Sequence, residues 1–481
     1  MTKIETKLLI GGAFVDALGG GTIPCVDPST GETFAAIPRG TAADIDRAVA
    51  AARDALDGDW GKLTAAERGR LMFRLSALIL RDADALAELE SRDVGKPFAQ
   101  AKADVTACAR YFEFYGGAAD KVHGDTIPYQ NGYTVLTLRE PHGVTAHIIP
   151  WNYPLQIIGR SVGAALAMGN ACVVKPGEDA SLTTLHLSRL AHEAGFPAGS
   201  LNVVTGYGEE AGAALSGHPG INHVSFTGSQ EVGVLVQQAA ARNIVPVTLE
   251  LGGKSPQVVF ADADLEQALT FVVRASVQNA GQTCSAGSRV LIERPIYERF
   301  AAMIADRFRQ LKVGPALEDH DVGPLINAQQ RDRVAGMVAA ARANGFPVLA
   351  EGSIVDGAPK GGFYVAPVLF GDVAPGCAIE QQEVFGPALA LIPFDGEEEA
   401  VRIANGTPFG LVAGVWTRDG GRQLRMARRL HAGQVFINNY GAGGGVELPF
   451  GGVKKSGFNR EKGFEALYGF SAVKTVAIKH D

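Results

Sequence analysis

The middle of this chain alternates between short apolar runs and longer segments in which apolar and polar residues mix. The apolar runs predict β-strands at residues 144–149, 171–174, 201–204, 223–226 and 246–250. The segments between them carry apolar residues near the helical spacing of about 3.6 and predict helices at 161–168, 181–194, 208–216 and 230–241. This alternation of strands and helices predicts an α/β fold with a doubly wound parallel sheet.

The same kind of pattern continues on both sides of this series. Apolar spacing predicts helices at 41–58 and 64–92, and Thr64 with Glu67 forms a capping box at the start of the second. Strand and helix units recur from Val258 to about Ile437 and predict a second α/β unit. No clean linker separates the two units, and we place their boundary near residue 251.

Composition narrows the classes of protein to which this chain can belong. Its 481 residues are 46% hydrophobic and 20% charged, which is typical of a globular protein with a large core. A net charge of −7 without a long Lys/Arg cluster argues against nucleic acid and anionic membranes as partners. No apolar stretch matches a membrane span, and no signal peptide is evident. Five scattered cysteines without a CxxC pair predict no metal site and favour a reducing, cytoplasmic location.

Polar residues and glycines follow the predicted strands of the first unit, where doubly wound sheets bind ligands. Lys175 and Glu178 suit the hydroxyl groups of a ribose, although they also suit an ordinary solvated ion pair. A carboxylate there would repel a 2′-phosphate, which favours NAD and leaves NADP as the less favoured cofactor. Gly228 and Ser229 open a helix and suit either a phosphate or a simple helix cap.

Cys284 lies in a run of small and polar residues, 281–289, which leaves space and backbone N–H groups around its sulfur. A packing cysteine is the alternative interpretation, since free cysteines are commonly inert and buried. Glu250 ends an apolar strand, where partial desolvation would raise its pKa toward the range of a general base. Asn152 stands in a stiff setting beside Trp151, from which its amide could donate to an oxyanion. Together these residues predict a nucleophile, a base and an oxyanion donor.

The chain is identified as a member of the NAD(P)-dependent aldehyde dehydrogenase superfamily by motifs that cover most of its length. The matching segments are 150–154, 175–178, 226–229, 249–255, 281–284, 383–387 and 449–452. The resemblance implies two Rossmann-type doubly wound domains plus a small β oligomerisation element, in a homodimer or homotetramer. It divides the chain into a NAD-binding domain (1–122 and 142–251), a catalytic domain (252–450) and the oligomerisation element (123–141 and 466–481).

The resemblance also implies the roles of individual residues. Cys284 would attack the aldehyde carbon, Asn152 and the Cys284 N–H would hold the oxyanion, and Glu250 would activate the water that hydrolyses a thioester. Glu383 would bind the nicotinamide ribose, and Phe385 would pack beside the ring. The full set of cofactor contacts would be Ile149, Trp151, Lys175, Glu178, Gly208, Gly228, Ser229, Gly233, Leu251, Glu383 and Phe385.

The chain departs from its relatives at three positions. Ser285 replaces the second cysteine that many relatives carry. Ser161 stands where betaine-aldehyde-type relatives often carry a lysine, which puts a relay through that position in doubt. Asn459 replaces the glycine of the family's late Gly-Arg-Glu segment, and the role of Glu461 in that segment is left open. A CoA-acylating aldehyde dehydrogenase and a cofactor-independent thiol esterase are the alternative functions, and Glu250 argues against the first because hydrolysis needs a base that activates water.

The substrate pocket is assigned by analogy with the family. Its aromatic side chains indicate an apolar or aromatic aldehyde, and the glycine-rich loop 441–445 removes bulk that would restrict a larger one. The residues expected to shape the pocket are Phe112, Phe114, Tyr115, Thr283, Ser285, Tyr440 and Val446.

Overall fold

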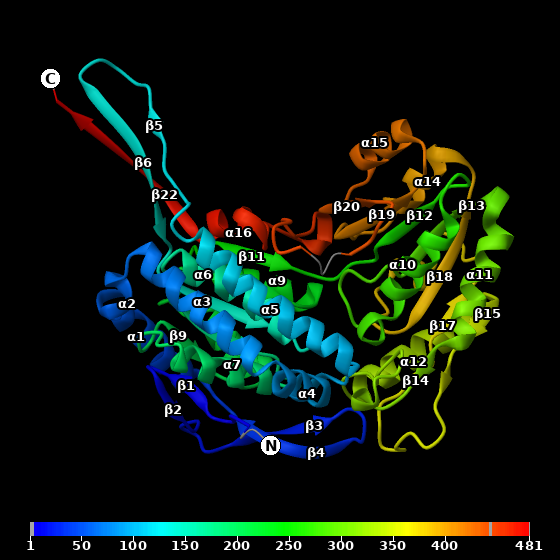
Figure 1. Ribbon diagram of the computed structural model, residues 1–481, viewed down its shortest axis with the longest axis horizontal. Coiled ribbons are helices and arrows are strands. Elements are labelled where there is room, and N and C mark those ends of the chain that lie inside the picture. The colour runs from blue at the N-terminus through cyan, green and yellow to red at the C-terminus, as the bar shows by residue number, and fades with distance from the viewer. Residues whose placement is uncertain (1–3, 442–444, 481) are drawn as a thin grey trace.

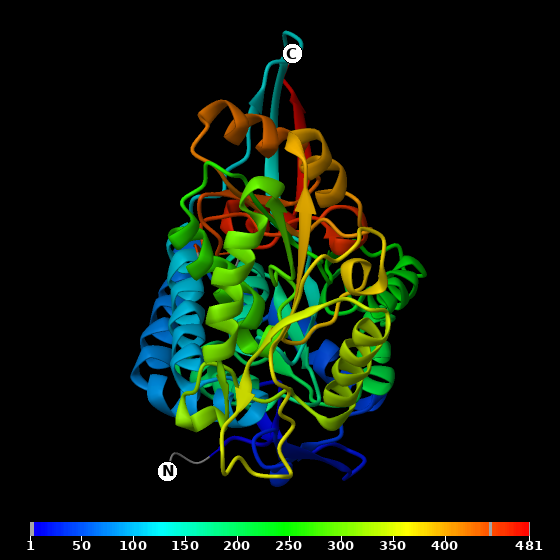
Figure 2. The same ribbon diagram turned by 90° about the vertical axis from the view of Figure 1, so that its right-hand side faces the viewer.

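A computed structural model describes residues 4–441 and 445–480 of the protein. Within these residues the chain forms two large sheets, one after the other along the sequence, and a β arm that projects from the body (Figure 1). The C-terminal end lies on this arm, and the N-terminal strands lie at the opposite end of the molecule (Figure 2). The two sheets therefore build one body, and the arm extends away from it.

The first sheet has the strand order β2-β1-β9-β8-β7-β10-β11-β21. The strands from β9 to β11 are parallel, whereas β1, β2 and β21 join the edges antiparallel. Its strands are β1 Leu8–Ile10, β2 Ala13–Val15, β7 Val144–Ile149, β8 Ala171–Pro176, β9 Leu201–Val203, β10 His223–Thr227, β11 Val247–Glu250 and β21 Gly457–Phe458. The predicted doubly wound parallel sheet is confirmed, because its central strands are the apolar runs that the pattern selected.

Helices cover both faces of this sheet. They are α1 Ala42–Asp57, α2 Asp59–Lys62, α3 Ala65–Arg81, α4 Ala83–Val94, α5 Phe98–Ala118, α6 Pro154–Ala167, α7 Leu182–Glu193, α8 Ala213–Ser216, α9 Gln230–Ala241 and α16 Gly463–Gly469. The predicted helix 64–92 is wrong as one element, because the chain breaks at Asp82, where ψ is 18°. Helix α6 begins earlier than predicted, since Pro154 occupies its first turn, where the fixed φ of proline is favourable. A π-helical turn, Gly208–Gly212, precedes α8.

The second sheet confirms the predicted second α/β unit. Its order is β15-β17-β18-β13-β12-β19-β20, and only its edge strand β15 pairs antiparallel within the described residues. The strands are β12 Pro256–Val259, β13 Arg289–Glu293, β15 Val348–Glu351, β17 Val368–Phe370, β18 Ala388–Phe394, β19 Val412–Trp416 and β20 Gln434–Ile437. The helices are α10 Leu265–Val277, α11 Tyr297–Gln310, α12 Ala328–Ala343, α13 Ala378–Gln381, α14 Gly396–Ala404 and α15 Gly420–Arg429.

The arm consists of β5 Thr126–Ile127, β6 Tyr133–Pro141 and the C-terminal β22 Ser471–Lys479 (Figure 1). Strand β22 pairs with β6 from end to end. Phe470, directly before β22, packs in the core of the first unit, so the arm begins at Ser471. The proposed division into domains stays a prediction. Two further strand pairs are small: β3 Thr22–Asp27 with β4 Glu32–Pro38, and β14 Lys312–Val313 with β16 Ser353–Ile354.

Each sheet has its own hydrophobic core. The core around the first sheet draws mainly on residues 8–251, and the core around the second draws on residues 258–450. Among the helices of the described residues, none is long and apolar enough to cross a bilayer. The carboxyl ends of β7, β10 and β11 carry Trp151, Gly228 and Glu250 to the region where the two units meet.

Candidate active site

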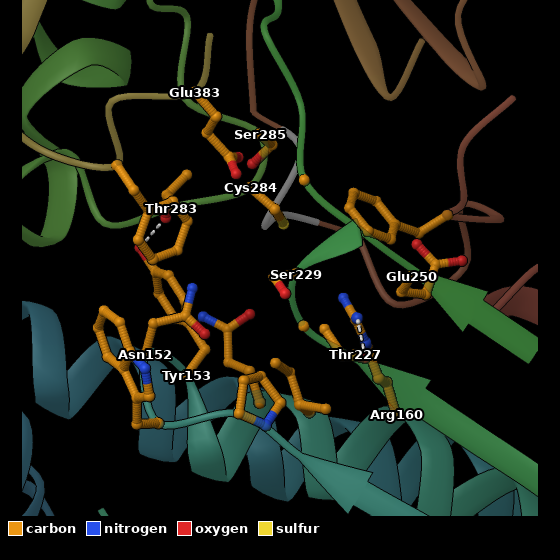
Figure 3. A pocket seen from close by; sticks show the side chains of 18 of the residues that line it. Asn152, Tyr153, Arg160, Thr227, Ser229, Glu250, Thr283, Cys284, Ser285 and Glu383 are labelled. Carbon is orange, nitrogen blue, oxygen red and sulfur yellow. Dashed lines mark hydrogen bonds between the residues drawn. The ribbon is translucent and has the colours of Figure 1, made fainter. Parts of the chain in front are cut away.

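Side chains from both units line one cavity of about 500 Å³. The first unit contributes Asn152 and Glu250, and the second contributes Cys284 and Glu383. Figure 3 shows Cys284 projecting from its loop, with Asn152 across the cavity and Glu250 to one side. The three residues predicted to act as nucleophile, oxyanion donor and base therefore face the same space.

The loop that carries Cys284 begins with an unusual backbone turn. Asn279, Ala280 and Gly281 all have positive φ, of 50°, 55° and 74°. A Cβ on Gly281 would lie 2.2 Å from the carbonyl oxygen of Gly386, so glycine is needed there for both backbone conformation and space. Gln282 Oε1 accepts a hydrogen bond from the Ile326 N–H at 3.0 Å. These features direct the chain so that Cys284 faces the cavity.

Two hydrogen bonds join Asn152 to this loop. The Asn152 Nδ2 donates to the carbonyl oxygen of Gln282 at 2.9 Å, and the Asn152 carbonyl accepts from Asn279 Nδ2 at 3.0 Å. An amide nitrogen carries two N–H groups, so one remains to donate to an oxygen atom beside Cys284. The Asn152 side chain is thus held in place, as an oxyanion donor must be.

Both neighbours of Cys284 are also fixed. Thr283 Oγ1 donates to the hydroxyl oxygen of Tyr153 at 2.7 Å, and the Tyr440 hydroxyl donates to the Ser285 carbonyl at 2.5 Å. The Tyr153 hydroxyl also accepts from Gln278 Nε2 at 2.9 Å. Cys284 therefore stands on a backbone segment that side chains hold on either side.

Glu250 is buried, and neither of its carboxylate oxygens has a hydrogen-bond partner among the described residues. Burial raises the pKa of Glu250 well above its ordinary value, and the nearby Glu461 carboxylate raises it further. Arg160 and Arg460 act in the opposite direction. A carboxylate with a raised pKa accepts a proton more readily, which suits a general base.

The thiol of Cys284 is also affected by its surroundings. Burial raises its pKa to about 12, so the thiol form dominates at neutral pH in the absence of a bound ligand. The positive charge of Arg160 opposes this rise, whereas Glu383 and Glu250 add to it. Loss of the thiol proton therefore depends on charges at the cavity wall.

The sequence interpretation missed Arg160, which lines the cavity from α6. Its guanidinium forms a buried ion pair with Glu461, whose role the sequence left open. Ser161, the neighbouring position in doubt, instead donates to the Ile157 carbonyl at 3.0 Å and is buried in the helix. The available signal was a single charge inside the apolar segment 157–166, but nothing in the sequence pointed to its partner.

Glu383 and Phe385 lie on the loop before β18, on the wall of the same cavity. Glu383 Oε1 accepts from the Gly253 N–H at 2.9 Å, and burial raises the pKa of this carboxyl to about 7. The ring of Phe385 meets Trp151 edge to face, with centroids 5.5 Å apart. Arg333 donates to the carbonyl oxygens of Glu383 and Val384, at 2.7 and 2.6 Å, and so holds this loop.

Gly228 and Ser229, at the start of α9, also line the cavity. Ser229 Oγ accepts from the Val232 N–H at 3.3 Å and so caps the helix. A Cβ on Gly228 would lie 2.5 Å from the ring of Phe226, which explains why glycine stands there. The helix start is therefore capped and also exposed to the cavity.

The remaining predicted cofactor contacts lie outside the wall of this cavity: Ile149, Lys175, Glu178, Gly208, Gly233 and Leu251. Lys175 Nζ and Glu178 Oε2 form an ion pair of 2.6 Å at the end of β8. A Cβ on Gly233 would lie 2.7 Å from Leu251, so that glycine lets α9 approach the chain after β11. Open space surrounds the Cα of Gly208.

Two of the residues expected to shape the substrate pocket, Thr283 and Ser285, line the cavity. Phe112 and Tyr115 are buried in the core of the first unit, and Tyr440 is buried against Ser285. Phe114 and Val446 also lie outside the cavity wall as described, and most of the loop 441–445 falls outside the described residues. The wall instead includes Tyr111, Gln156, Ile157, Arg160, Phe450 and Lys462.

A cysteine and a buried carboxylate face one cavity between two α/β units, an arrangement that is typical of enzymes with a thiol nucleophile. The sequence model of the aldehyde dehydrogenase family matches residues 14–476, so the chain belongs to that family. It is accordingly an oxidoreductase that acts on aldehydes. The resemblance predicted from the motifs is confirmed.

Individual relatives agree with this assignment. A hydroxyisobutyraldehyde dehydrogenase from Mycolicibacterium austroafricanum is 43% identical over 99% of this chain and 94% of its own. A solved structure from Burkholderia cenocepacia, provisionally named as an aldehyde dehydrogenase, is 64% identical with a TM-score of 0.98 over 99% of this chain and all of its own. The NAD⁺ complex of an aldehyde dehydrogenase from Bacillus cereus is 40% identical with a TM-score of 0.96, over 99% of this chain and 97% of its own. The predicted aldehyde-dehydrogenase-like fold is therefore confirmed.

Proposed function

We propose that the enzyme oxidises an aldehyde to a free carboxylic acid with NAD as the hydride acceptor. Cys284, Asn152 and Glu250 would carry the chemistry, and the net reaction converts aldehyde, NAD⁺ and water into acid, NADH and a proton. One observation carries the proposal. Glu250, with no hydrogen-bond partner among the described residues for either carboxylate oxygen, faces the same cavity as Cys284.

In the first step, the sulfur of Cys284 attacks the aldehyde carbon and the carbonyl oxygen becomes an oxyanion. The free N–H of the Asn152 amide and the backbone N–H of Cys284 hold this oxyanion. Asn152 is suited to this because its other N–H is already bound to the Gln282 carbonyl, which fixes the plane of the amide. The thiol proton passes to a base, and Glu250 can receive it because neither of its carboxylate oxygens has a hydrogen-bond partner among the described residues.

The described residues fit a bound dinucleotide. Lys175 and Glu178 would meet the hydroxyls of one ribose, and the start of α9 at Gly228 and Ser229 would meet the pyrophosphate. Glu383 would accept from the second ribose, because Gly253 binds its Oε1 and its Oε2 is left for a ligand. When bound, NAD⁺ supplies a hydride acceptor, and the substrate carbon is left as a thioester on Cys284. The NAD⁺ complex of the Bacillus cereus relative supports this assignment.

Glu250 would complete the reaction. It removes a proton from a water molecule, the resulting hydroxide attacks the thioester carbon, and the acid leaves as the Cys284 sulfur is released. The raised pKa of Glu250 strengthens it as a proton acceptor, and its burial keeps bulk water from competing. This arrangement favours hydrolysis over transfer of the acyl group to CoA.

The identity of the aldehyde is a separate question. The cavity wall combines apolar Ile157 and Phe450 with polar Tyr111 and Gln156. An aldehyde with a small apolar body and one polar substituent fits this wall better than a purely aromatic one. The name of the Mycolicibacterium relative, a hydroxyisobutyraldehyde dehydrogenase, supports a substrate of that kind. We accordingly propose a short hydroxylated aldehyde in place of the apolar or aromatic aldehyde expected from sequence.

The location and assembly of the enzyme also remain proposals. The arm exposes Tyr129, Leu138, Val473 and Ile478, and apolar surface of this kind is commonly covered by another chain. We propose that the arm joins copies of the chain in a homodimer or homotetramer. The scattered cysteines support a reducing, cytoplasmic location.

The proposed function is tested by assaying the purified protein with NAD⁺ and short aldehydes, with and without CoA. We expect NADH and free acid to form in equal amounts without CoA. Cys284→Ser should abolish NADH formation. Product that forms only when CoA is supplied would show the acylating reaction instead, and ester cleavage without NAD binding would show a thiol esterase.

A further inference from the structure

The Arg160 side chain is held at the cavity wall by groups from separate segments of the chain. Its guanidinium forms an ion pair with Glu461, and its Nη2 donates to Thr227 Oγ1 at 3.3 Å. Its Cζ lies 4.9 Å from the centre of the Phe450 ring. The side chains of the ion pair are 9% and 0% exposed. A planar guanidinium enclosed in this way keeps its charge in one place.

Glu461 is fixed as well. Ser225 Oγ, from the neighbouring strand β10, donates to Glu461 Oε1 at 2.8 Å. The backbones of Glu461 and Phe450 form an antiparallel bridge, with N–H to carbonyl distances of 2.6 and 2.8 Å. Because the Phe450 ring also packs on Arg160, this bridge positions both the anion and the ring that enclose the cation.

The two members of this ion pair influence the pKa values of Cys284 and Glu250 in different ways. For Cys284, Arg160 is the strongest influence that lowers the pKa, against the rise caused by burial. For Glu250, the strongest charge effect comes from Glu461, which raises the pKa and outweighs the lowering by Arg160. The cation is therefore the strongest lowering influence on the thiol, and the anion is the strongest charge influence on the carboxyl. Figure 3 shows Arg160 and Glu250 on the same side of the cavity that Cys284 faces.

We propose, on the basis of the function proposed above, that the Arg160–Glu461 ion pair positions charge at the active site. The guanidinium stabilises the anionic form of Cys284, while the carboxylate keeps Glu250 able to accept a proton. One buried pair thereby prepares the nucleophile for attack and the base for hydrolysis. Arg160 and Glu461 act through Cys284 and Glu250, so they are positioning residues.

The carboxyl and phenol groups that interact with Cys284 do not replace Arg160. Glu250 on β11 and Glu383 before β18 are carboxylates, and both raise the pKa of the thiol. Tyr440, after β20, interacts with Cys284 but is an uncharged phenol whose own pKa is raised by burial. Among the described side chains with a main influence on Cys284, Arg160 is the cation. Its removal should therefore change the reactivity of the thiol directly.

Around Glu250, Arg460 is a second cation and Glu461 is the principal anion. Arg460 Nη1 donates to the carbonyl oxygens of Gly452 and Asn459, at 2.9 and 2.6 Å, so its charge is turned partly toward the backbone. Loss of Glu461 would leave both cations acting on Glu250 without an opposing charge. We therefore expect the proton affinity of Glu250 to fall when Glu461 is neutralised.

The test measures the reactivity of Cys284 directly on the full-length protein without NAD or aldehyde. The rate of alkylation by iodoacetamide at about pH 8 is followed by mass spectrometry of the peptide that contains Cys284, so that the other cysteines do not interfere. Below the pKa, each unit of increase lowers the thiolate fraction about tenfold. We expect Arg160→Met to slow alkylation about tenfold or more, and Arg160→Lys to restore most of the rate.

A matched control variant distinguishes the effect of the Arg160 charge on Cys284 from the effect of a general loss of stability. Arg68 is a half-buried arginine, which donates to the Ala167 carbonyl at 3.1 Å at the far end of α6. Arg68→Met should disturb that helix without slowing the alkylation of Cys284. Equal rates in Arg160→Met and the unchanged protein would overturn the proposal, as would equal slowing by Arg160→Met and Arg68→Met.

Removing one member of a buried ion pair leaves an unpaired charge, which disfavours folding. The double variant Arg160→Met with Glu461→Gln contains no unpaired charge and serves if Arg160→Met does not fold. The proposal expects the same tenfold slowing of alkylation in the double variant. A rate equal to that of the unchanged protein would contradict it.

Glu461→Gln tests the second half of the proposal. The enzyme is acylated with p-nitrophenyl acetate, and the rate of deacylation is measured against pH without NAD. We expect the midpoint of the rising limb to move about one unit or more toward lower pH, because Glu250 loses the neighbouring anion. If the midpoint of the deacylation rate against pH does not move, the proposed influence of Glu461 on Glu250 is wrong. Failure of the proposed function would appear differently, as aldehyde oxidation that persists in Cys284→Ser.

Discussion

The Asn152 side chain donates a 2.9 Å hydrogen bond to the backbone carbonyl of Gln282, two residues before Cys284. This bond joins the loop after β7 in the first unit to the loop after α10 in the second. It keeps one N–H of the Asn152 amide engaged and directs the amide to the cavity that contains Cys284. The position of the Asn152 amide and the position of the Cys284 sulfur are therefore linked by the same contact.

Asn152→Ala should lower kcat by about 100-fold to 1000-fold, because an oxyanion donor acts mainly on the transition state. Steady-state kinetics with NAD⁺ and a short aldehyde measure the effect. Alkylation of Cys284 by iodoacetamide should stay within about threefold of normal, since Asn152 carries no charge. A loss of kcat of less than about tenfold would show that Asn152 only supports the loop.

The Gly281 turn should tolerate no side chain. Gly281→Ala is expected to destabilise the protein by about 2 kcal/mol or more, because the new Cβ would meet the Gly386 carbonyl at 2.2 Å in a backbone with φ of 74°. Gly345→Ala is the matched control, since Gly345 has φ of 81° but open space around it. Urea unfolding of both variants measures the difference, and an equal loss of stability would contradict the steric account.

Glu178 should set the choice between NAD and NADP. The Glu178 carboxylate, paired with Lys175 at 2.6 Å, would repel a 2′-phosphate. The unchanged enzyme should therefore show the higher kcat/KM with NAD⁺. Glu178→Ala should raise the ratio of the NADP⁺ value to the NAD⁺ value by about tenfold or more, which corresponds to about 1.4 kcal/mol. A preference of the unchanged enzyme for NADP⁺ would show that this assignment is wrong.

Glu383 should make stability depend on pH in a defined window. Burial raises its folded pKa from 4.5 to about 7, so the folded state binds more protons than the unfolded state between these values. The free energy of unfolding should therefore fall as pH rises through this window, by about 3 kcal/mol at most from this group. Urea unfolding of Glu383→Gln between about pH 5 and 8 should show a smaller decrease than the unchanged protein. If the free energy of unfolding changes with pH equally in the two proteins, Glu383 does not contribute to this pH dependence.

The sequence predicted the central sheet well because its parallel strands are covered on both faces. Such strands are continuous apolar runs, such as β7 and β8, and they are easily distinguished from amphipathic helices. The residues after these strands were then predicted to face a ligand, and Gly228 and Ser229 do line the cavity. The break at Asp82 was not predictable from periodicity, since apolar spacing continues from α3 into α4.

The missed parts of the site depend on contacts between distant segments. Arg160 and Glu461 are 301 positions apart in the chain, and no local pattern indicates that they form an ion pair. Tyr153 and Thr283 bond across 130 positions in the same way. Phe112 and Tyr115 were expected at the pocket by analogy with the family, but they pack in the core. Local sequence shows that a side chain is aromatic or charged, whereas its neighbours are fixed only by the fold.

The central claim is that Cys284 forms a thioester which Glu250 hydrolyses, and Glu250→Gln tests it most directly. This variant keeps the nucleophile and loses the base, so a single turnover with NAD⁺ and aldehyde should stop at the acylated enzyme. Rapid quenching and mass spectrometry should find the acyl group on the Cys284 peptide, in an amount close to one per chain and equal to the NADH formed. Steady release of acid by Glu250→Gln at the normal rate, with no acyl group on Cys284, would contradict the account.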